Sequence, residues 1–167
     1  MQALAEPIPE NAASGRSSVD ADCAVELHKY VACFIGEKLC AIAASDVAEV
    51  VLPLTASSLP NAPVAVTGIS AVRGDIVALL DVRRMLGIGA EEVLTQRSRS
   101  IVLKPQDGRT QGAFTVDRMW EVLQLAEDEI EPPENTVGIR RGTADTASGK
   151  VVVIDAQKLL DEMDFAQ

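Results

Sequence analysis

Residues 68–87 read GISAVRGDIVALLDVRRMLG and contain one unusual feature, a charged Arg73 inside an otherwise apolar run. The segment before it, 69–72, is typical of a short strand. The Gly-Asp pair after it is typical of a turn, because Gly tolerates positive φ and Asp hydrogen-bonds to nearby backbone. The five apolar residues 76–80 indicate a strand buried on both faces. An arginine at a turn between two buried strands is held at the surface, where it can recognise a partner.

A short helix is predicted directly after this strand. Asp81 suits the N-cap position, residues 82–86 form one or two turns, and Gly87 ends them. The same order recurs near the end of the chain, where Asp155 follows the apolar segment 151–154 and begins a final helix. The sequence therefore predicts two strand-Asp-helix units.

A second pair of segments repeats at a similar spacing. Residues 47–51 (VAEVV) resemble 119–123 (MWEVL), and 79–86 (LLDVRRML) resemble 153–160 (VIDAQKLL). Two motifs in the same order at nearly the same offset indicate two related β-rich halves. Each half is too small to bury much surface alone, so we expect them to share a core or to pack side by side with a groove between them.

The remaining elements are shorter and are read from alternation and turn residues. A hairpin is predicted over 30–43, with Gly36-Glu37 as its two-residue turn. The others, in chain order, are a helical turn capped by Ser45-Asp46 and continuing through Val47 and Ala48, an extended segment 49–52, a loop 54–64, a connector 87–96, strands 100–104, 111–116 and 120–125, a turn 106–108, a loop 128–134 and a weakly patterned segment 137–149.

Composition limits the classes of function. The 167 residues are 47% hydrophobic but only 3% aromatic, so the core must be aliphatic. A net charge of −10 argues against nucleic-acid binding, because phosphates repel an acidic surface. No apolar run is long enough to span a membrane, and the first residues do not resemble a secretory signal. We expect a disordered N-terminal tail over 1–27, a single domain over 28–167 and a cytoplasmic location.

The sequence lacks the residue constellations of the common catalytic and metal sites. Its single histidine, His28, lies at the edge of the predicted tail, and the glycines of 87–89 do not continue into a nucleotide-binding motif. Cys33 and Cys40 are not spaced as a redox or zinc pair, and an odd total of three with Cys23 argues against a disulfide framework. We therefore predict no enzyme activity, no catalytic residue, no metal and no cofactor, with a small enzyme of unfamiliar site as the open alternative.

Recognition of a protein partner is the class of function that remains. Glu49 and Arg73 are the charges best placed for it, since each lies beside apolar β-rich sequence. We expect them to form an ion pair, because carboxylate and guanidinium match in geometry. Such a pair is either an internal tie alone or a tie that also presents a binding surface, and the residues leave both open.

The order of these features resembles the CheW-like family of bacterial chemosensory coupling proteins. The match runs through the hairpin, VAEV at 47–50, a proline-containing loop, GISAVRGDIV at 68–77 and the apolar-Asp81 step, and it covers about 29–160. The resemblance implies an all-β fold of two intertwined SH3-like five-stranded β-barrels with short helices.

The resemblance also implies a function. It implies a non-enzymatic adaptor that couples the cytoplasmic tip of a chemoreceptor to the regulatory domain of a CheA-type histidine kinase, in membrane-associated arrays that include other CheW-like domains. No nucleic acid and no direct membrane insertion are expected. By the same resemblance the expected receptor-binding residues are Val47, Glu49, Arg73 and Met119, and the expected kinase-binding residues are Val50 and Val51.

Three features depart from the family pattern. The family usually has Asn at the position of Ala71, Pro at that of Ala78, and a longer segment between Pro133 and Lys150. The short segment suggests that a strand or loop of the second half is trimmed. These departures motivate an alternative role, in which an auxiliary protein binds the kinase only and limits or modulates array assembly.

Overall fold

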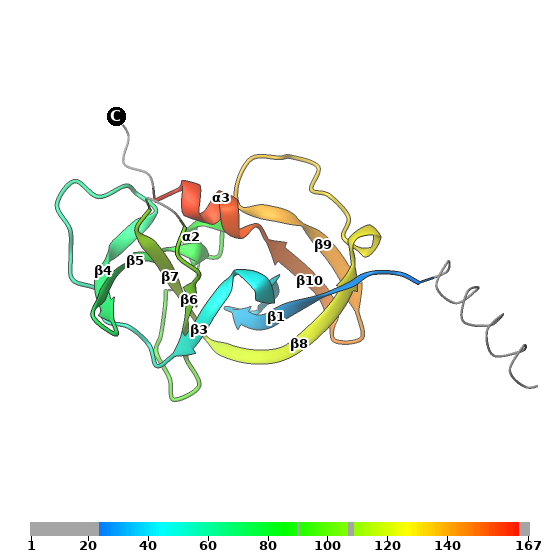
Figure 1. Cartoon of the computed structure of the whole chain (residues 1–167), viewed down its shortest axis with the longest axis horizontal. Helices are drawn as coiled ribbons and strands as arrows, with labels where there is room; N and C mark the ends of the chain where they lie inside the picture. Colours follow the sequence, from blue (N-terminus) through cyan, green and yellow to red (C-terminus); the bar gives the residue numbers. More distant parts are fainter. Residues whose placement is uncertain (1–23, 90, 107–108, 164–167) are drawn as a thin grey trace, which may run out of the picture.

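The computed structural model describes residues 24–89, 91–106 and 109–163 (Figure 1). Positions 1–23 of the predicted disordered tail lie outside the described residues. No helix in the described part of the chain is long and apolar enough to cross a membrane. In chain order the elements are β1 (Leu27–Ile35), β2 (Lys38–Ala43), η1 (Ala44–Asp46), β3 (Val47–Val51), β4 (Val66–Val72), β5 (Asp75–Leu80), α2 (Val82–Met85), β6 (Arg99–Leu103), β7 (Gln111–Val116), β8 (Arg118–Ala126), η2 (Glu127–Glu129), β9 (Arg140–Thr146), β10 (Gly149–Ile154) and α3 (Ala156–Asp161).

The strands form two five-stranded sheets. One has the order β8-β1-β2-β10-β9 and the other β3-β6-β7-β5-β4. The first sheet therefore takes strands from both ends of the chain, while the second uses the middle. Only Asp117 separates β7 of one sheet from β8 of the other, so the chain crosses directly between them (Figure 1). This confirms the all-β fold of two intertwined five-stranded units.

Each sheet closes on itself through one isolated bridge. The chain beyond β3 returns at Ser57 to pair with Ile69 of β4, with backbone N–H to carbonyl distances of 2.8 and 2.9 Å. The chain beyond β8 returns at Glu131 to pair with Thr143 of β9, at 2.7 and 2.9 Å. The two bridges occupy equivalent positions in the two halves, since the same length of chain separates Ser57 from Glu131 and Ile69 from Thr143. The bridges join the outer strands of each sheet and make it a barrel.

A glycine lies next to each bridge. A Cβ on Gly68 would stand 2.5 Å from the Ser57 carbonyl oxygen, and one on Gly142 would overlap the Glu131 carbonyl oxygen. Both glycines sit inside strands, where the usual reason for this residue is close approach of another backbone. The repeat seen in the sequence thus reflects two barrels closed by the same device.

The largest core cluster lies between the barrels and draws residues from both sheets. Cys33 and Ile42 contribute from one sheet, Ile101 and Phe114 from the other, and Leu159 from α3. Two smaller clusters fill the individual barrels, around Tyr30 and Val151 in one and around Val77 and Val102 in the other. The two halves therefore share a core, which is one of the two arrangements that the sequence repeat left open.

Several local predictions are confirmed. Ile35 pairs with Lys38, so Gly36-Glu37 is the two-residue turn of the first hairpin. Asp81 accepts a hydrogen bond from Arg84 N at 3.1 Å, and Asp155 accepts bonds from the first turn of α3. Asp81 and Asp155 are therefore the helix caps that the repeated motif indicated.

The central hairpin differs from the prediction by one residue. Val72 pairs with Asp75, so the turn is Arg73-Gly74 and Asp75 is the first residue of β5. Ile76 is 61% exposed, because only the later part of β5 enters the barrel. The segment 76–80 is therefore not buried along its whole length, and Arg73 occupies the turn itself.

Two other element predictions are wrong. The short helical turn ends at Asp46, and Val47 and Ala48 are already in β3, because Val47 pairs with Leu103 of β6. The weakly patterned segment 137–149 contains β9, so no strand of the second half is trimmed. Its inward positions include Gly142 and Ala144, which give little hydrophobic periodicity.

Cys33 and Cys40 lie directly opposite each other across the β1–β2 hairpin and are buried as free thiols. Burial raises the pKa of the Cys40 thiol to about 12, and it raises the pKa of the Cys33 thiol well above its usual value. Since the thiolate is the reactive form, both side chains are small core residues rather than reactive groups.

We predict that neither thiol reacts with iodoacetamide while the protein is folded. With the pKa of Cys40 near 12, only about one thiol in ten thousand is ionised at about pH 8. Peptide mapping after an hour of alkylation should find Cys33 and Cys40 unmodified, and the same experiment in concentrated guanidinium chloride should find both modified. Modification of Cys40 in the folded protein at the rate of free cysteine would contradict the buried environment.

Candidate functional site

The tip of the β4–β5 hairpin carries Arg73 in an uncommon backbone conformation. Arg73 has φ +52° and Gly74 has φ +88°. Two positive φ values in a two-residue hairpin loop are those of a type I′ turn, whose twist matches that of the flanking strands. The left-handed region costs a residue with a side chain roughly 1 kcal/mol. The hairpin therefore presents an arginine where Asn would be less strained.

The side chain of Arg73 is 80% exposed and is tied to Glu49 of β3. Its Nε donates to Oε2 of Glu49 at 3.1 Å, and its Nη2 lies 3.0 Å from the same oxygen as an ion pair. This confirms the predicted ion pair, although both nitrogens converge on one oxygen. An exposed pair of this kind contributes about 0–1 kcal/mol to stability. Its main effect is to orient the guanidinium group over β3.

The other predicted site residues lie on different faces. Val47 and Met119 are half-buried and pack against the core shared by the barrels. Val50 is 40% exposed on the outer face of β3, whereas Val51 is half-buried and packs against the core of its barrel. The structure thus brings together Glu49 and Arg73, and it separates the two kinase-facing candidates, of which Val50 alone is exposed.

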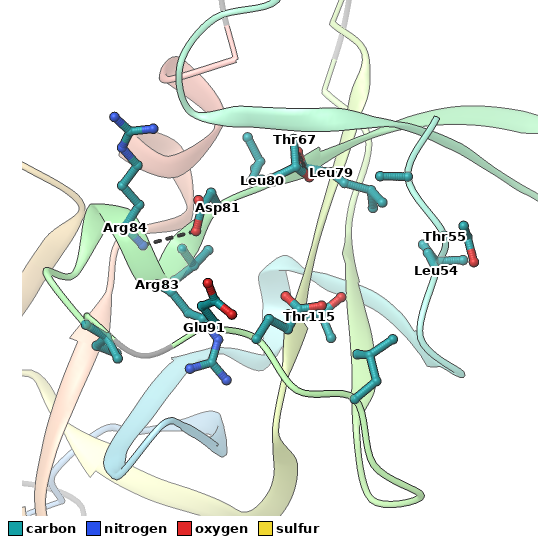
Figure 2. Close-up of a pocket in the computed structure, with 15 residues that line it drawn as sticks. Leu54, Thr55, Thr67, Leu79, Leu80, Asp81, Arg83, Arg84, Glu91 and Thr115 are labelled. Atoms are coloured by element: carbon teal, nitrogen blue, oxygen red, sulfur yellow. Dashed lines mark hydrogen bonds between the residues drawn. The ribbon is translucent and has the colours of Figure 1, made fainter. Parts of the chain in front are cut away.

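A cavity of about 590 Å³ lies beside α2. Figure 2 shows Asp81, Arg83 and Arg84 on one side of it and Leu54 and Thr55 on the other. Burial raises the pKa of the Glu92 carboxyl group in its lining. The lining holds no His or Cys, and in the described part of the chain no three His, Cys, Asp or Glu side chains gather as metal ligands.

Arg83 connects this cavity to the junction of the two barrels. It is only 7% exposed, and its Nη2 pairs with Asp117 between β7 and β8. Asp117 also accepts a hydrogen bond from the backbone N–H of Gly36 at the β1–β2 turn. The Asp117 carboxylate therefore ties α2, which follows β5 of one sheet, to the β1–β2 hairpin of the other sheet. This role is structural.

A second surface pocket, which no pattern in the sequence indicates, has a volume of about 410 Å³ and is lined by Arg97, Arg99, Arg118, Met119 and Trp120. It joins the segment that enters β6 to the start of β8. The guanidinium carbon of Arg118 lies 4.0 Å from the ring centre of Phe34 and 5.0 Å from that of Trp120. The whole of β6 and β7 separates Arg97 from Arg118 in the sequence, so no local motif reveals the pocket.

Known proteins resemble this chain both in sequence and in fold. Residues 29–164 match the family described as the CheW-like domain. The chemotaxis protein CheW of Helicobacter pylori is 26% identical over 112 residues, which are 67% of this chain and 66% of that protein. The crystal structure of the scaffolding protein TtCheW from Thermoanaerobacter tengcongensis matches with a TM-score of 0.67 and 28% identity, over 78% of this chain and 90% of that one.

Proposed function

Because the chain belongs to the CheW-like domain family, we propose that it is a non-enzymatic adaptor that couples chemoreceptors to a CheA-type histidine kinase. Its place is then in the cytoplasm, at membrane-associated receptor arrays. The names of its relatives, a chemotaxis protein and a scaffolding protein, support this role. Its partners are the receptor's cytoplasmic tip, the kinase's regulatory domain and other CheW-like domains.

The observation that carries the proposal is the presentation of Arg73. A strained, exposed arginine at a hairpin tip contributes little to stability, and strain of this kind is commonly kept at functional sites. Among the described residues, Nη1 of Arg73 has no hydrogen-bond partner, so it is available to an acceptor on another protein. In the proposal Arg73 contacts the receptor, Glu49 orients it, and Val47 and Met119 contribute apolar contacts. Val50 packs on the kinase, with Val51 supporting it from below.

Co-purification tests the role directly. The chain is captured with a CheA-type kinase from its own cell and with a receptor signalling fragment, together and separately. Capture of both partners supports the coupling role. Capture of the kinase alone, with displacement of another coupling protein and lower kinase activity, favours the auxiliary role that Ala71 and Ala78 motivate. Capture of neither from folded protein removes both.

We predict that Arg73→Glu weakens binding of the receptor fragment about tenfold or more, because it replaces the contacting cation with an anion beside Glu49. Kinase binding should stay within about twofold, since Arg73 pairs with Glu49, and successive side chains of a strand such as Glu49 and Val50 point to opposite faces. Isothermal titration calorimetry with each partner measures both affinities. Arg84→Glu makes the same change of charge at another exposed arginine and serves as the control.

A charge swap separates a binding residue from an internal tie. The double variant Glu49→Arg with Arg73→Glu rebuilds the ion pair in reverse. If the pair only stabilises the fold, the swap restores receptor affinity. If Arg73 contacts the receptor, affinity stays low although the pair is restored. Full recovery in the swap variant would overturn the role proposed for Arg73.

A further inference from the structure

The arginine pocket, lined by Arg97, Arg99, Arg118, Met119 and Trp120, lies where the two barrels meet. Arg97 and Arg99 come from the segment that enters β6 of one sheet, and Arg118 begins β8 of the other. Arg97 and Trp120 are exposed, while Arg99, Arg118 and Met119 are half-buried. The pocket is therefore open to solvent and has charged walls with an apolar side.

Contacts with neighbouring groups hold three of its five lining side chains, those of Arg99, Arg118 and Trp120, in place. Nη1 of Arg99 donates to the carbonyl oxygens of Gln96 and Ser98, at 2.9 and 2.7 Å. Arg118 stacks against Phe34, whose ring makes an edge-to-face contact with Trp120 at 5.3 Å between centres. Nε1 of Trp120 donates to Ser148 Oγ at 3.2 Å. Groups fixed in this way lose little freedom when a ligand binds.

The positive charge of the pocket is not neutralised within the described residues. None of the three arginines forms an ion pair there, and no Asp or Glu lines the pocket. Asp117, the neighbour of Arg118, is occupied by Arg83 and Gly36. In a chain of net charge −10, three arginines of this kind around one pocket form a local attraction for anionic groups.

We propose that this pocket binds an acidic segment of the receptor partner, an inference that rests on the proposed function. Carboxylates of that segment pair with Arg97, Arg99 and Arg118, and its apolar groups pack on Met119 and Trp120. Met119 belongs to the expected receptor-binding set, so the pocket continues that surface onto the second barrel. The exposed position of Trp120 suits a protein segment, which covers an open surface better than a small anion does.

The first test measures the affinity of the receptor fragment for the variant with Arg97, Arg99 and Arg118 all changed to Gln. We expect about tenfold weaker binding and a smaller loss of affinity with added salt, since exposed charge contacts are screened. The control changes the exposed Lys29, Lys104 and Lys150 to Gln, which removes the same charge elsewhere. Arg97→Gln alone, at an exposed side chain, should show about a twofold effect without risk to folding.

The second test does not need the receptor. A fluorescent decaglutamate peptide should bind the wild-type chain at low salt, and the arginine variant about tenfold more weakly, with a decaglutamine peptide as the control. Equal binding by the arginine and lysine variants, of peptide or receptor, would overturn the proposal. A wild-type chain that binds the peptide but not the receptor would remove the proposed function and leave the anion site.

The acidic N-terminal residues of this chain are a competing occupant. Changing Glu6, Glu10, Asp20 and Asp22 to their amides in the full chain tests them. Unchanged peptide affinity supports the partner as occupant. An increase that depends on the three arginines would assign the pocket to the chain's own segment and overturn the partner assignment.

Discussion

Gly142→Ala is expected to lower the free energy of unfolding by about 3–5 kcal/mol, a large part of the total for a domain of this size. The new Cβ would overlap the Glu131 carbonyl oxygen and stand 2.7 Å from Ile130 Cγ2. Neither neighbour can move freely, because Glu131 and Thr143 exchange two backbone hydrogen bonds. The barrel must open at its closing bridge, which forfeits both bonds and the packing around them. Urea unfolding followed by circular dichroism measures the loss.

Two matched variants serve as comparisons for the Gly142→Ala prediction. Gly68→Ala, at the equivalent position of the other barrel, should cost a similar amount, because its Cβ meets the Ser57 carbonyl oxygen at 2.5 Å and Ala56 Cβ at 3.0 Å. Gly89→Ala should be neutral or slightly stabilising, since no atom of the described residues lies within 4 Å of its Cβ. Equal stability of the Gly142 and Gly89 variants would show that the bridges do not close the barrels.

These glycines also show what the sequence could and could not reveal. The two motifs that repeat at a nearly constant offset predicted two related halves, because the strand-Asp-helix unit has strong local signals in both. The closing bridges are non-local contacts between a loop and a strand. Gly142 therefore lies in a segment whose sequence has little pattern, and β9 could not be recognised there because its inward positions are filled by small side chains.

The part of the candidate site that depends on one unusual residue could be predicted from the sequence. A charge inside an apolar run marked Arg73, and its pairing with Glu49 follows from complementary charge. The faces of β3 were harder to assign, since the register shift between Val47 and Glu49 interrupts the alternation. The arginine pocket could not be predicted, because it requires knowing that Arg99 and Arg118 meet at the junction of two sheets.

Arg83→Met is expected to destabilise the fold by about 2–4 kcal/mol. Removing one partner of a fully buried pair costs roughly 3–5 kcal/mol, and the lower figure allows for the partial solvation of Asp117. The side chain of Arg83 is 9% exposed and that of Asp117 is 29% exposed. Among the described residues, Asp117 would keep only its bond from Gly36 N, so the connection between α2 and the β1–β2 turn is lost. Urea unfolding of the variant and the wild-type chain measures the difference.

A double-mutant cycle identifies the cause of that loss. Asp117→Asn keeps an acceptor for Gly36 N but removes the charge, so combining it with Arg83→Met should recover about 1 kcal/mol or more relative to Arg83→Met alone. Arg84→Met is the control, because Arg84 is exposed and its hydrogen bond to Asp81 is made by its backbone N–H. We expect it to change stability by less than about 0.5 kcal/mol. If Arg83→Met were as stable as Arg84→Met, the shared apolar core alone would hold the barrels together.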